Sequence, residues 1–118
     1  MAAIQRIANE TRATELGGRI HVADNPWTRF VGLIGRRGLA QGEGLHIVPC
    51  GSVHMFFMLF ALDIIYLDRE FRVVKTVSNL RPWRLSAARG AKTTLELPVG
   101  TIAHTETVAG DQIVLQEL

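Results

Sequence analysis

The side chains best suited to chemistry lie in or beside the most apolar segment of the chain. A thiol, an imidazole and a carboxylate, those of Cys50, His54 and Asp63, fall within residues 50–68. Together they are the parts of a nucleophilic site, with Cys50 as the nucleophile, His54 as its base and Asp63 orienting the histidine. The same three groups are also ligands that zinc accepts.

Spacing weighs against both uses. On one continuous strand Cys50 and His54 would stand about 13 Å apart, at roughly 3.3 Å per residue, and they approach only if Gly51 turns the chain. A zinc site needs three or four ligands, and the remaining histidines are scattered along the chain, as His21, His46 and His104. We therefore predict no metal and no cofactor, and a thiol-dependent enzyme is the alternative hypothesis.

Asp63 allows two interpretations. Strand alternation places it on one face with Ile65 and Leu67, where a carboxylate needs a partner. The first interpretation is structural, an ion pair or a cap on backbone N–H groups. The second is functional, a carboxylate in a pocket that pairs with Arg29 or Arg84.

A second group of interest is Arg81-Pro82-Trp83-Arg84. The indole could stack on a base or another aromatic ligand while the arginines bind phosphate. The interpretation we favour is that a buried Trp83 anchors a loop and that Arg84 pairs with an acidic side chain. The neighbouring side chains Met55, Phe56, Phe57, Met58 and Phe60 are expected in the core.

Charge is unevenly distributed along the chain. Residues 71–95 carry six Lys or Arg and no acid, whereas residues 93–118 carry four acids and no Lys or Arg. Weak nucleic-acid binding through residues 71–95 is therefore a third functional hypothesis. We expect the two stretches to neutralise each other as neighbours in the fold, so no nucleic-acid partner is expected.

One helix stands out among the elements that must position these groups. Asp24 or Asn25 can cap it, Pro26 suits its first position, and Gly35 and Gly38 would end it. Its apolar stripe would consist of Trp27, Phe30, Val31 and Ile34.

Short strands account for most of the remaining chain. They are expected over residues 19–23, after a break at Gly17-Gly18, and over residues 45–48, 53–57, 62–67, 71–77, 93–97 and 112–116. Residues 62–77 should form a hairpin, residues 79–90 a long loop and residues 101–107 one helical turn. These elements predict a β-rich α+β fold, mainly antiparallel and barrel-like.

Composition sets the broad class. The chain has 118 residues, 47% hydrophobic and 20% charged, with a net charge of +2, which is ordinary for one globular domain. We divide it into an N-terminal extension over residues 1–17, which can form a strand, and a single domain over residues 18–118. The single cysteine, and the lack of a secretion signal or of an apolar run of roughly 20 residues, predict a cytoplasmic protein without a membrane span.

The chain resembles a bacterial and archaeal family known as domain of unknown function 192. The most specific block is residues 50–68, with Ser52, His54, Phe57, Met58, Asp63 and Asp68. Other matching residues are Arg29 with Gly32-Leu33 and Arg36, Gly42 with Gly44-Leu45, Pro82-Trp83-Arg84, Leu95-Glu96-Leu97-Pro98 with Gly100, and Gly110-Asp111. The chain departs from the family pattern at Ile34, Gly35, Ala61 and Phe71, and the last of these weighs against a tight two-residue hairpin turn. The resemblance implies a mainly antiparallel β fold with one prominent helix, and it brings no established activity.

Our first functional hypothesis is therefore a small non-enzymatic domain that binds a small ligand or a protein partner. Its pocket would lie near Asp63 and His54. The candidate ligand-binding residues are Arg29, His54, Asp63, Trp83 and Arg84.

Overall fold

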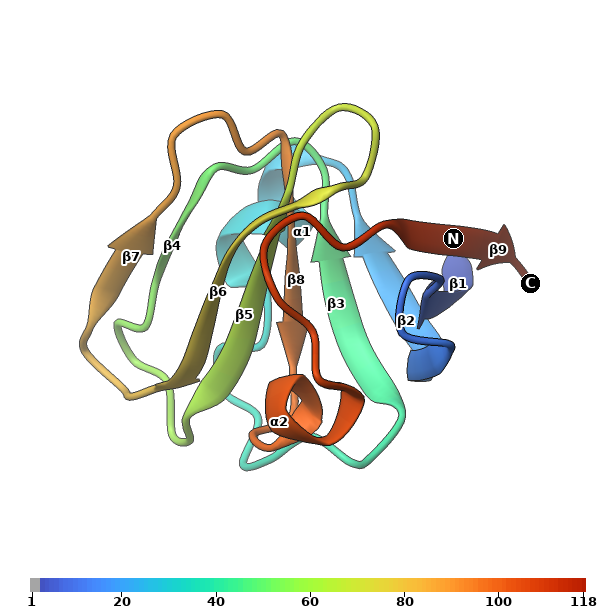
Figure 1. The fold of residues 1–118 in the computed structure, drawn as a ribbon. Helices are drawn as coiled ribbons and strands as arrows, with labels where there is room; N and C mark the ends of the chain where they lie inside the picture. The colour runs from blue at the N-terminus through green and yellow to red at the C-terminus, as the bar shows by residue number, and fades with distance from the viewer. Residues whose placement is uncertain (1–2) are drawn as a thin grey trace.

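One seven-stranded sheet curls strongly, with β6 and β9 as its two edge strands (Figure 1). The computed structural model describes residues 3–118. The order in the sheet is β6-β5-β8-β3-β2-β1-β9, and β4 and β7 form a separate two-stranded sheet. The strands are β1 (Ile4–Asn9), β2 (Thr14–Ala23), β3 (Glu43–Ile47), β4 (Ser52–His54), β5 (Leu62–Leu67), β6 (Val73–Leu80), β7 (Leu85–Ala87), β8 (Thr93–Leu97) and β9 (Ile113–Glu117); the helices are α1 (Pro26–Val31) and α2 (Thr101–Thr105).

Across the described residues the strands pair almost entirely antiparallel, and only β2 and β3 run parallel. An isolated bridge between Arg72 and Gln112 joins the two ends of the sheet, where the N–H of Ile113 donates to the carbonyl of Phe71 at 2.9 Å. The result is a half-barrel with two short helices. It confirms the predicted β-rich α+β fold. No helix in residues 3–118 has the length and apolar character needed to cross a membrane.

The sheet has apolar residues packed on both faces. Every residue of β5 is buried, and its side chains alternate between two clusters. Ile64 and Tyr66 belong to one cluster, under α1 and the 49–60 segment, whereas Ile65 and Leu67 belong to the other, inside the half-barrel. This double burial explains why residues 62–67 read as a continuous apolar run, and the predicted bounds of this strand are confirmed.

Gly17 and Gly18 lie within β2, so the predicted break is wrong. The strand needs the first glycine because a Cβ there would lie 2.5 Å from Ile20 Cδ1 and 2.8 Å from the carbonyl oxygen of Gly42. A Cβ at Gly18 would meet nothing within 4 Å.

Gly17→Ala is therefore expected to lower the free energy of unfolding by about 1–3 kcal/mol through overpacking. Gly18→Ala is the matched control and should change it by less than about 0.5 kcal/mol. Urea unfolding of the two variants measures the difference, and equal losses would contradict the packing explanation.

Helix α1 is shorter than predicted. The side chain of Asn25 accepts a hydrogen bond from the Thr28 N–H at 2.9 Å, which confirms the predicted start. The helix ends at Gly32 rather than at Gly35, because Gly32 adopts a φ of 50° and its N–H bonds back to Thr28. Trp27, expected in the apolar stripe, is 72% exposed, and the side chain of Phe30 lies outside the part of the chain described.

Two loops also differ from expectation. Residues 85–87 form strand β7 within the predicted long loop, because they pair with β4. The 68–71 turn is longer than a two-residue hairpin: Phe71 takes a φ of 62°, and Asp68 Oδ1 accepts from the N–H groups of Glu70 and Arg72 at 2.9 Å each. The Asp68 side chain thus supports a left-handed residue that is not glycine.

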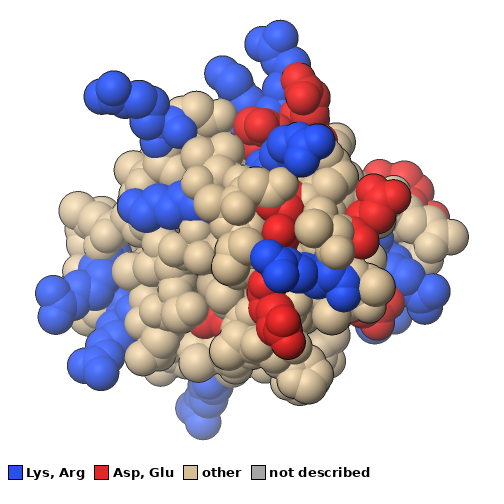
Figure 2. Space-filling model, viewed as in Figure 1, with Lys and Arg blue, Asp and Glu red and all other residues tan. Residues whose placement is uncertain are grey.

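Charged side chains are distributed unevenly over the face seen in Figure 2. Lys and Arg dominate the left-hand side, where β4, β6 and β7 lie in Figure 1, and most Asp and Glu lie to the right. The ion pairs among the described residues are Arg6–Glu15, Arg12–Asp111 and Arg36–Glu43. None of these ion pairs joins a basic residue of 71–95 to an acidic residue of 93–118. The neutralisation expected between the two stretches is therefore not found among them.

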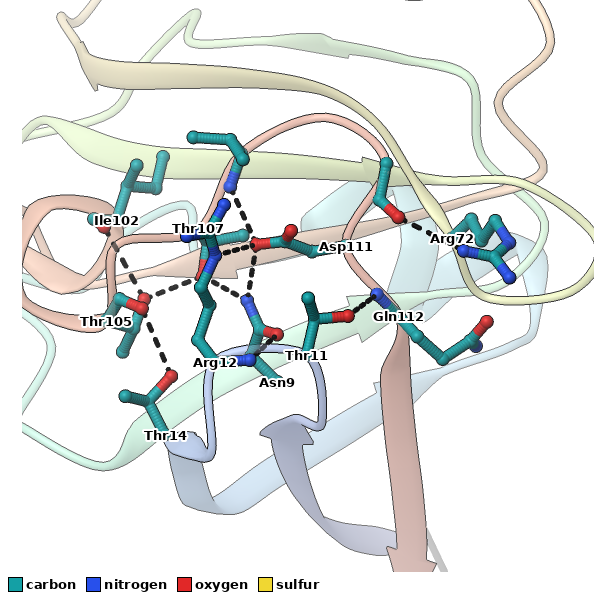
Figure 3. A network of polar contacts seen from close by, with 12 residues as sticks. Asn9, Thr11, Arg12, Thr14, Arg72, Ile102, Thr105, Thr107, Asp111 and Gln112 are labelled. Atoms are coloured by element: carbon teal, nitrogen blue, oxygen red, sulfur yellow. Dashed lines mark hydrogen bonds and ion pairs between the residues drawn. The ribbon is translucent and has the colours of Figure 1, made fainter.

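A buried polar network fastens the β1–β2 turn to the segment after α2 (Figure 3). Asn9 Nδ2 donates to Thr107 Oγ1 and to Asp111 Oδ2, each at 3.0 Å, and Arg12 Nε donates to the same carboxylate at 3.1 Å. Burial alone would raise the pKa of Asp111, but hydrogen bonds from Asn9, Arg12 and the Val108 N–H outweigh it and lower that pKa. The network fixes the route by which the chain returns to pair with β1.

Candidate functional site

A cavity of about 440 Å³ lies between the C-terminal end of α1, residues 49–54 and β8. Its volume falls within the range of small-molecule sites. The residues that line it are Pro26, Arg29, Val31, Gly32, Leu33, Ile34, Ile47, Pro49, Cys50, Gly51, Ser52, Val53, His54, Met58 and Glu96. The wall is therefore largely apolar, with a few groups capable of chemistry.

Glu96 is the most unusual of these groups. It pairs in register with Leu45 of β3 and Ile64 of β5, both members of the cluster beneath α1. Its side chain thus points from β8 toward α1, and it is only 7% exposed. No hydrogen bond or ion pair to its carboxyl group is formed within the described chain, and burial raises its pKa to about 7.

Gly32 gives this carboxyl group its place beneath α1. A Cβ on Gly32 would lie 4.0 Å from Glu96 Oε1. The same glycine ends α1 through its positive φ, so one residue both ends the helix and lies over Glu96. The cavity follows from a chain reversal that glycine makes possible.

Tyr66 adds a second unpartnered polar group nearby. Its hydroxyl is buried without a hydrogen-bond partner in the described part of the chain. Burial raises the pKa of Tyr66, and the nearby side chain of Ser86 lowers it in part. The negative charges of Cys50 and Glu96 raise this pKa further. Tyr66 therefore lies near Cys50 and Glu96, which line the cavity, although it is not itself a lining residue.

Cys50 is fixed by backbone hydrogen bonds, and its thiol also forms a hydrogen bond. Its N–H donates to the carbonyl of Lys92 at 2.8 Å, and its carbonyl accepts from Thr94 Oγ1 at 3.0 Å. The S–H donates to the carbonyl of Ser52 at 2.9 Å. No hydrogen bond joins Cys50 to His54 among the described residues, so the thiol and imidazole are not arranged as a nucleophile and its base.

His54 links the cavity to an exposed aromatic cluster. Its ring lies 5.2 Å from that of Phe56, which lies 5.9 Å from Trp83, and Trp83 lies 5.0 Å from Phe57. Phe57 and Trp83 are 66% and 60% exposed and both take positive φ values. The predictions that Trp83 is a buried anchor and that Phe56 and Phe57 are core residues are therefore wrong; Met55 and Met58 are in the core as predicted.

The exposure of Trp83 has a backbone cause. The N–H of Trp83 donates to the carbonyl of Met55, and the N–H of Met55 donates to the carbonyl of Arg84, each at 2.8 Å. These bonds hold the 81–84 loop against the segment after β4, and the left-handed conformation turns the indole outward. Arg84 is exposed, and it forms no ion pair among the described residues.

Asp63 lies away from the cavity, on the opposite face of β5. Its Oδ1 accepts from the Asn79 N–H at 2.9 Å, and its Oδ2 accepts from the N–H groups of Gly100 and Ile102 at 3.1 and 2.9 Å. These bonds match the structural interpretation, a cap on backbone N–H groups, and Asp63 forms no ion pair with Arg29 or Arg84 among the described residues.

The cavity therefore brings together three of the residues nominated from the sequence and leaves out three. Arg29, Cys50 and His54 line it, and Asp63, Trp83 and Arg84 do not.

Sequence reasoning missed Glu96 as a site residue. The signal was its position in the alternating run Thr93–Leu97, where a carboxylate falls on the same strand face as Thr94 between apolar neighbours. Within residues 3–118 no three His, Cys, Asp or Glu side chains gather closely enough to hold a metal ion.

These features define a small half-barrel domain with one mixed polar and apolar cavity beneath its first helix. The chain belongs to the DUF192 family, described as Uncharacterized ACR, whose model matches residues 7–115. Among curated relatives, a UPF0127 protein of Thermococcus sibiricus is 35% identical over 113 residues, which cover 91% of this chain and 72% of the relative. A UPF0127 protein of Pyrococcus abyssi is 35% identical over 114 residues, which cover 91% and 94%. Both organisms are archaea.

Solved structures show the same fold at lower identity. A protein of unknown function from Novosphingobium aromaticivorans matches with a TM-score of 0.81 and 22% identity, over 96% of this chain and 84% of that one. A "putative transcription regulator" from Sinorhizobium meliloti matches with a TM-score of 0.79 and 20% identity, over 98% and 94%. At these identities the likeness concerns the fold.

Proposed function

We propose that this protein is a non-enzymatic domain that binds a small organic molecule in the cavity beneath α1, with Glu96 as the central recognition group. The observation that carries the proposal is a glutamate that is only 7% exposed, whose carboxyl group lacks a partner in the described chain and belongs to a cavity wall. Folded proteins rarely bury such a group unpaired, because burial removes its hydration without replacement. Sites that break this rule are typical of function.

The chemistry of Glu96 limits the group it would recognise. A carboxyl with a pKa of about 7 is partly ionised at neutral pH. When ionised it accepts hydrogen bonds only, so the matching ligand group is a hydrogen-bond donor or a cation. The apolar wall provided by Leu33, Ile47 and Met58 suits a hydrocarbon portion of the same molecule.

A binding role agrees with the state of Cys50. Its S–H is committed to the carbonyl of Ser52 rather than to a base, so the thiol contributes shape and a polar surface. A reducing compartment such as the cytoplasm would keep this thiol free, and the proposal places the protein there.

Fragment binding to the ¹⁵N-labelled chain tests the proposal. The probes are small fragments that each bear one amine, amide, alcohol or carboxylate. At least one donor class should shift the amide signals of Gly32, Ser52 and Glu96, because these residues line the cavity. Glu96→Gln should remove the response to the amine, and Glu70→Gln, at an exposed glutamate, should leave it unchanged. If no fragment shifts these signals, the proposal fails.

A further inference from the structure

We infer that the ligand is a zwitterion of the amino-acid class, whose ammonium pairs with Glu96 and whose carboxylate pairs with Arg29. This inference rests on the proposed function and adds the class of molecule to it. It depends on two groups of opposite charge that line one cavity, neither of them with a charged partner among the described residues.

The two groups lie at different depths. Glu96 is almost completely buried, whereas Arg29 is exposed on the last turn of α1. A ligand that enters the cavity therefore meets a buried acid on its inner side and a cation nearer the surface, and an α-amino acid carries the two matching groups on one carbon. The guanidinium matches the planar geometry of a carboxylate and can bind it through two parallel hydrogen bonds.

Other charge types fit less well. An anion without an ammonium would bring negative charge toward an unpaired carboxyl group, which repels it when ionised. A simple amine would satisfy Glu96 and leave Arg29 unused. A zwitterion uses both groups and enters without net charge, and its hydrocarbon part can contact Leu33, Val53 and Met58 of the wall.

Four forms of one amino acid separate these possibilities. The probes are leucine, leucinamide, N-acetylleucine and N-acetylleucinamide, with the same set for alanine and phenylalanine, titrated by NMR. The free amino acid of at least one set should bind about tenfold more tightly than its amide, because the amide lacks the carboxylate for Arg29. The N-acetyl forms, which lack the ammonium, should not bind.

Variants assign the two ends. Arg29→Gln should reduce the affinity for the free amino acid to that for its amide. Glu96→Gln should abolish binding of both. Arg37→Gln is the control, since this exposed arginine lies close in sequence to α1 but does not line the cavity.

The pH dependence gives an independent readout. Affinity for the free amino acid should rise about tenfold from pH 6 to pH 8, because Glu96, with a pKa of about 7, ionises over this range. The other charged or titratable groups beside it are Arg29 from α1, Cys50 and His54 from residues 49–54, and Tyr66 from β5. His54→Gln should preserve the rise and Glu96→Gln should remove it.

The results that would overturn the inference differ from those that would overturn the proposed function. If amides bind as tightly as free amino acids, or if N-acetyl forms bind best, the zwitterion is excluded and the cavity remains a binding site. If the amino-acid sets do not bind while amine fragments shift the cavity signals, only the zwitterion fails. If neither binds, both fail.

Discussion

Asp63→Ala is expected to lower the free energy of unfolding by about 3–5 kcal/mol. The carboxylate accepts three backbone N–H groups, from Asn79, Gly100 and Ile102, and alanine leaves all three without their partner in a buried site. Hydrogen bonds to charged groups contribute about 1.5–3 kcal/mol each, with losses that do not add fully. A domain of this size has a free energy of unfolding of about 5–15 kcal/mol in total, so the loss of the Asp63 side chain would remove a large part of it.

Asp63→Asn keeps the experiment informative if the alanine variant does not fold. The amide retains one oxygen, so we expect a smaller loss of about 2 kcal/mol. Asp24→Asn, at an exposed aspartate before α1, is the control and should stay within about 0.5 kcal/mol of the wild type. Urea unfolding at neutral pH compares the three, and an Asp63→Ala loss below about 1 kcal/mol would exclude the capping role.

Glu96→Gln and His46→Gln are expected to change the pH dependence of stability in opposite directions. His46 is buried, its Nδ1–H donates to Gln5 Oε1 at 2.9 Å, and its Nε2 has no partner in the described chain. Burial lowers the pKa of His46 to about 4, against 6.5 for an exposed histidine. Burial raises the pKa of Glu96 to about 7, against 4.5.

The signs follow from which state binds protons. Between about pH 4 and 6.5 the unfolded chain protonates His46 and the native state does not, so stability rises with pH. Between about pH 4.5 and 7 the unfolded chain ionises Glu96 while the native state keeps its proton, so stability falls with pH. Each slope amounts to about 3 kcal/mol over its range, and in the wild type they largely cancel between pH 4.5 and 6.5.

Removing one group should therefore reveal the other. Glu96→Gln should show stability rising through this window, and above pH 7 it should be more stable than the wild type, because glutamine carries no buried charge. His46→Gln should show stability falling toward pH 7. Urea titrations at half-unit pH steps measure both slopes, and parallel curves for all three proteins would contradict the assignment.

The strands that sequence reasoning placed correctly are those whose signal is local. Residues 62–67 and 93–97 are apolar or β-branched runs that end at a turn residue or a proline, and both appear as predicted. The break expected at Gly17-Gly18 failed because contacts from Ile20 and Gly42 create the need for a small residue there. Helix α1 ended early for a similar reason, since Gly32 rather than Gly35 reverses the chain.

The candidate site was predicted only in part because its geometry is set by register. Cys50 and His54 attracted attention by residue type, and both line the cavity. Glu96 joins them because β8 pairs with β3 and β5, which places its side chain under α1. Asp63 was an equally good candidate by residue type, but it lies on β5, on the face opposite the cavity, and its side chain points toward the start of α2. A sequence lists both carboxylates, and only the pairing of distant strands tells them apart.

The position of β1 between β2 and β9 has a consequence for biosynthesis. Residues 4–9 are translated well before residues 113–117, which complete one side of this strand, and the N–H of Leu118 bonds to the carbonyl of Ile4. Until residues 113–117 have left the ribosome, the nascent chain carries an unpaired strand edge at β1. Such an edge can pair with neighbouring chains, so chaperones that bind nascent chains or fast synthesis would protect this fold during its production.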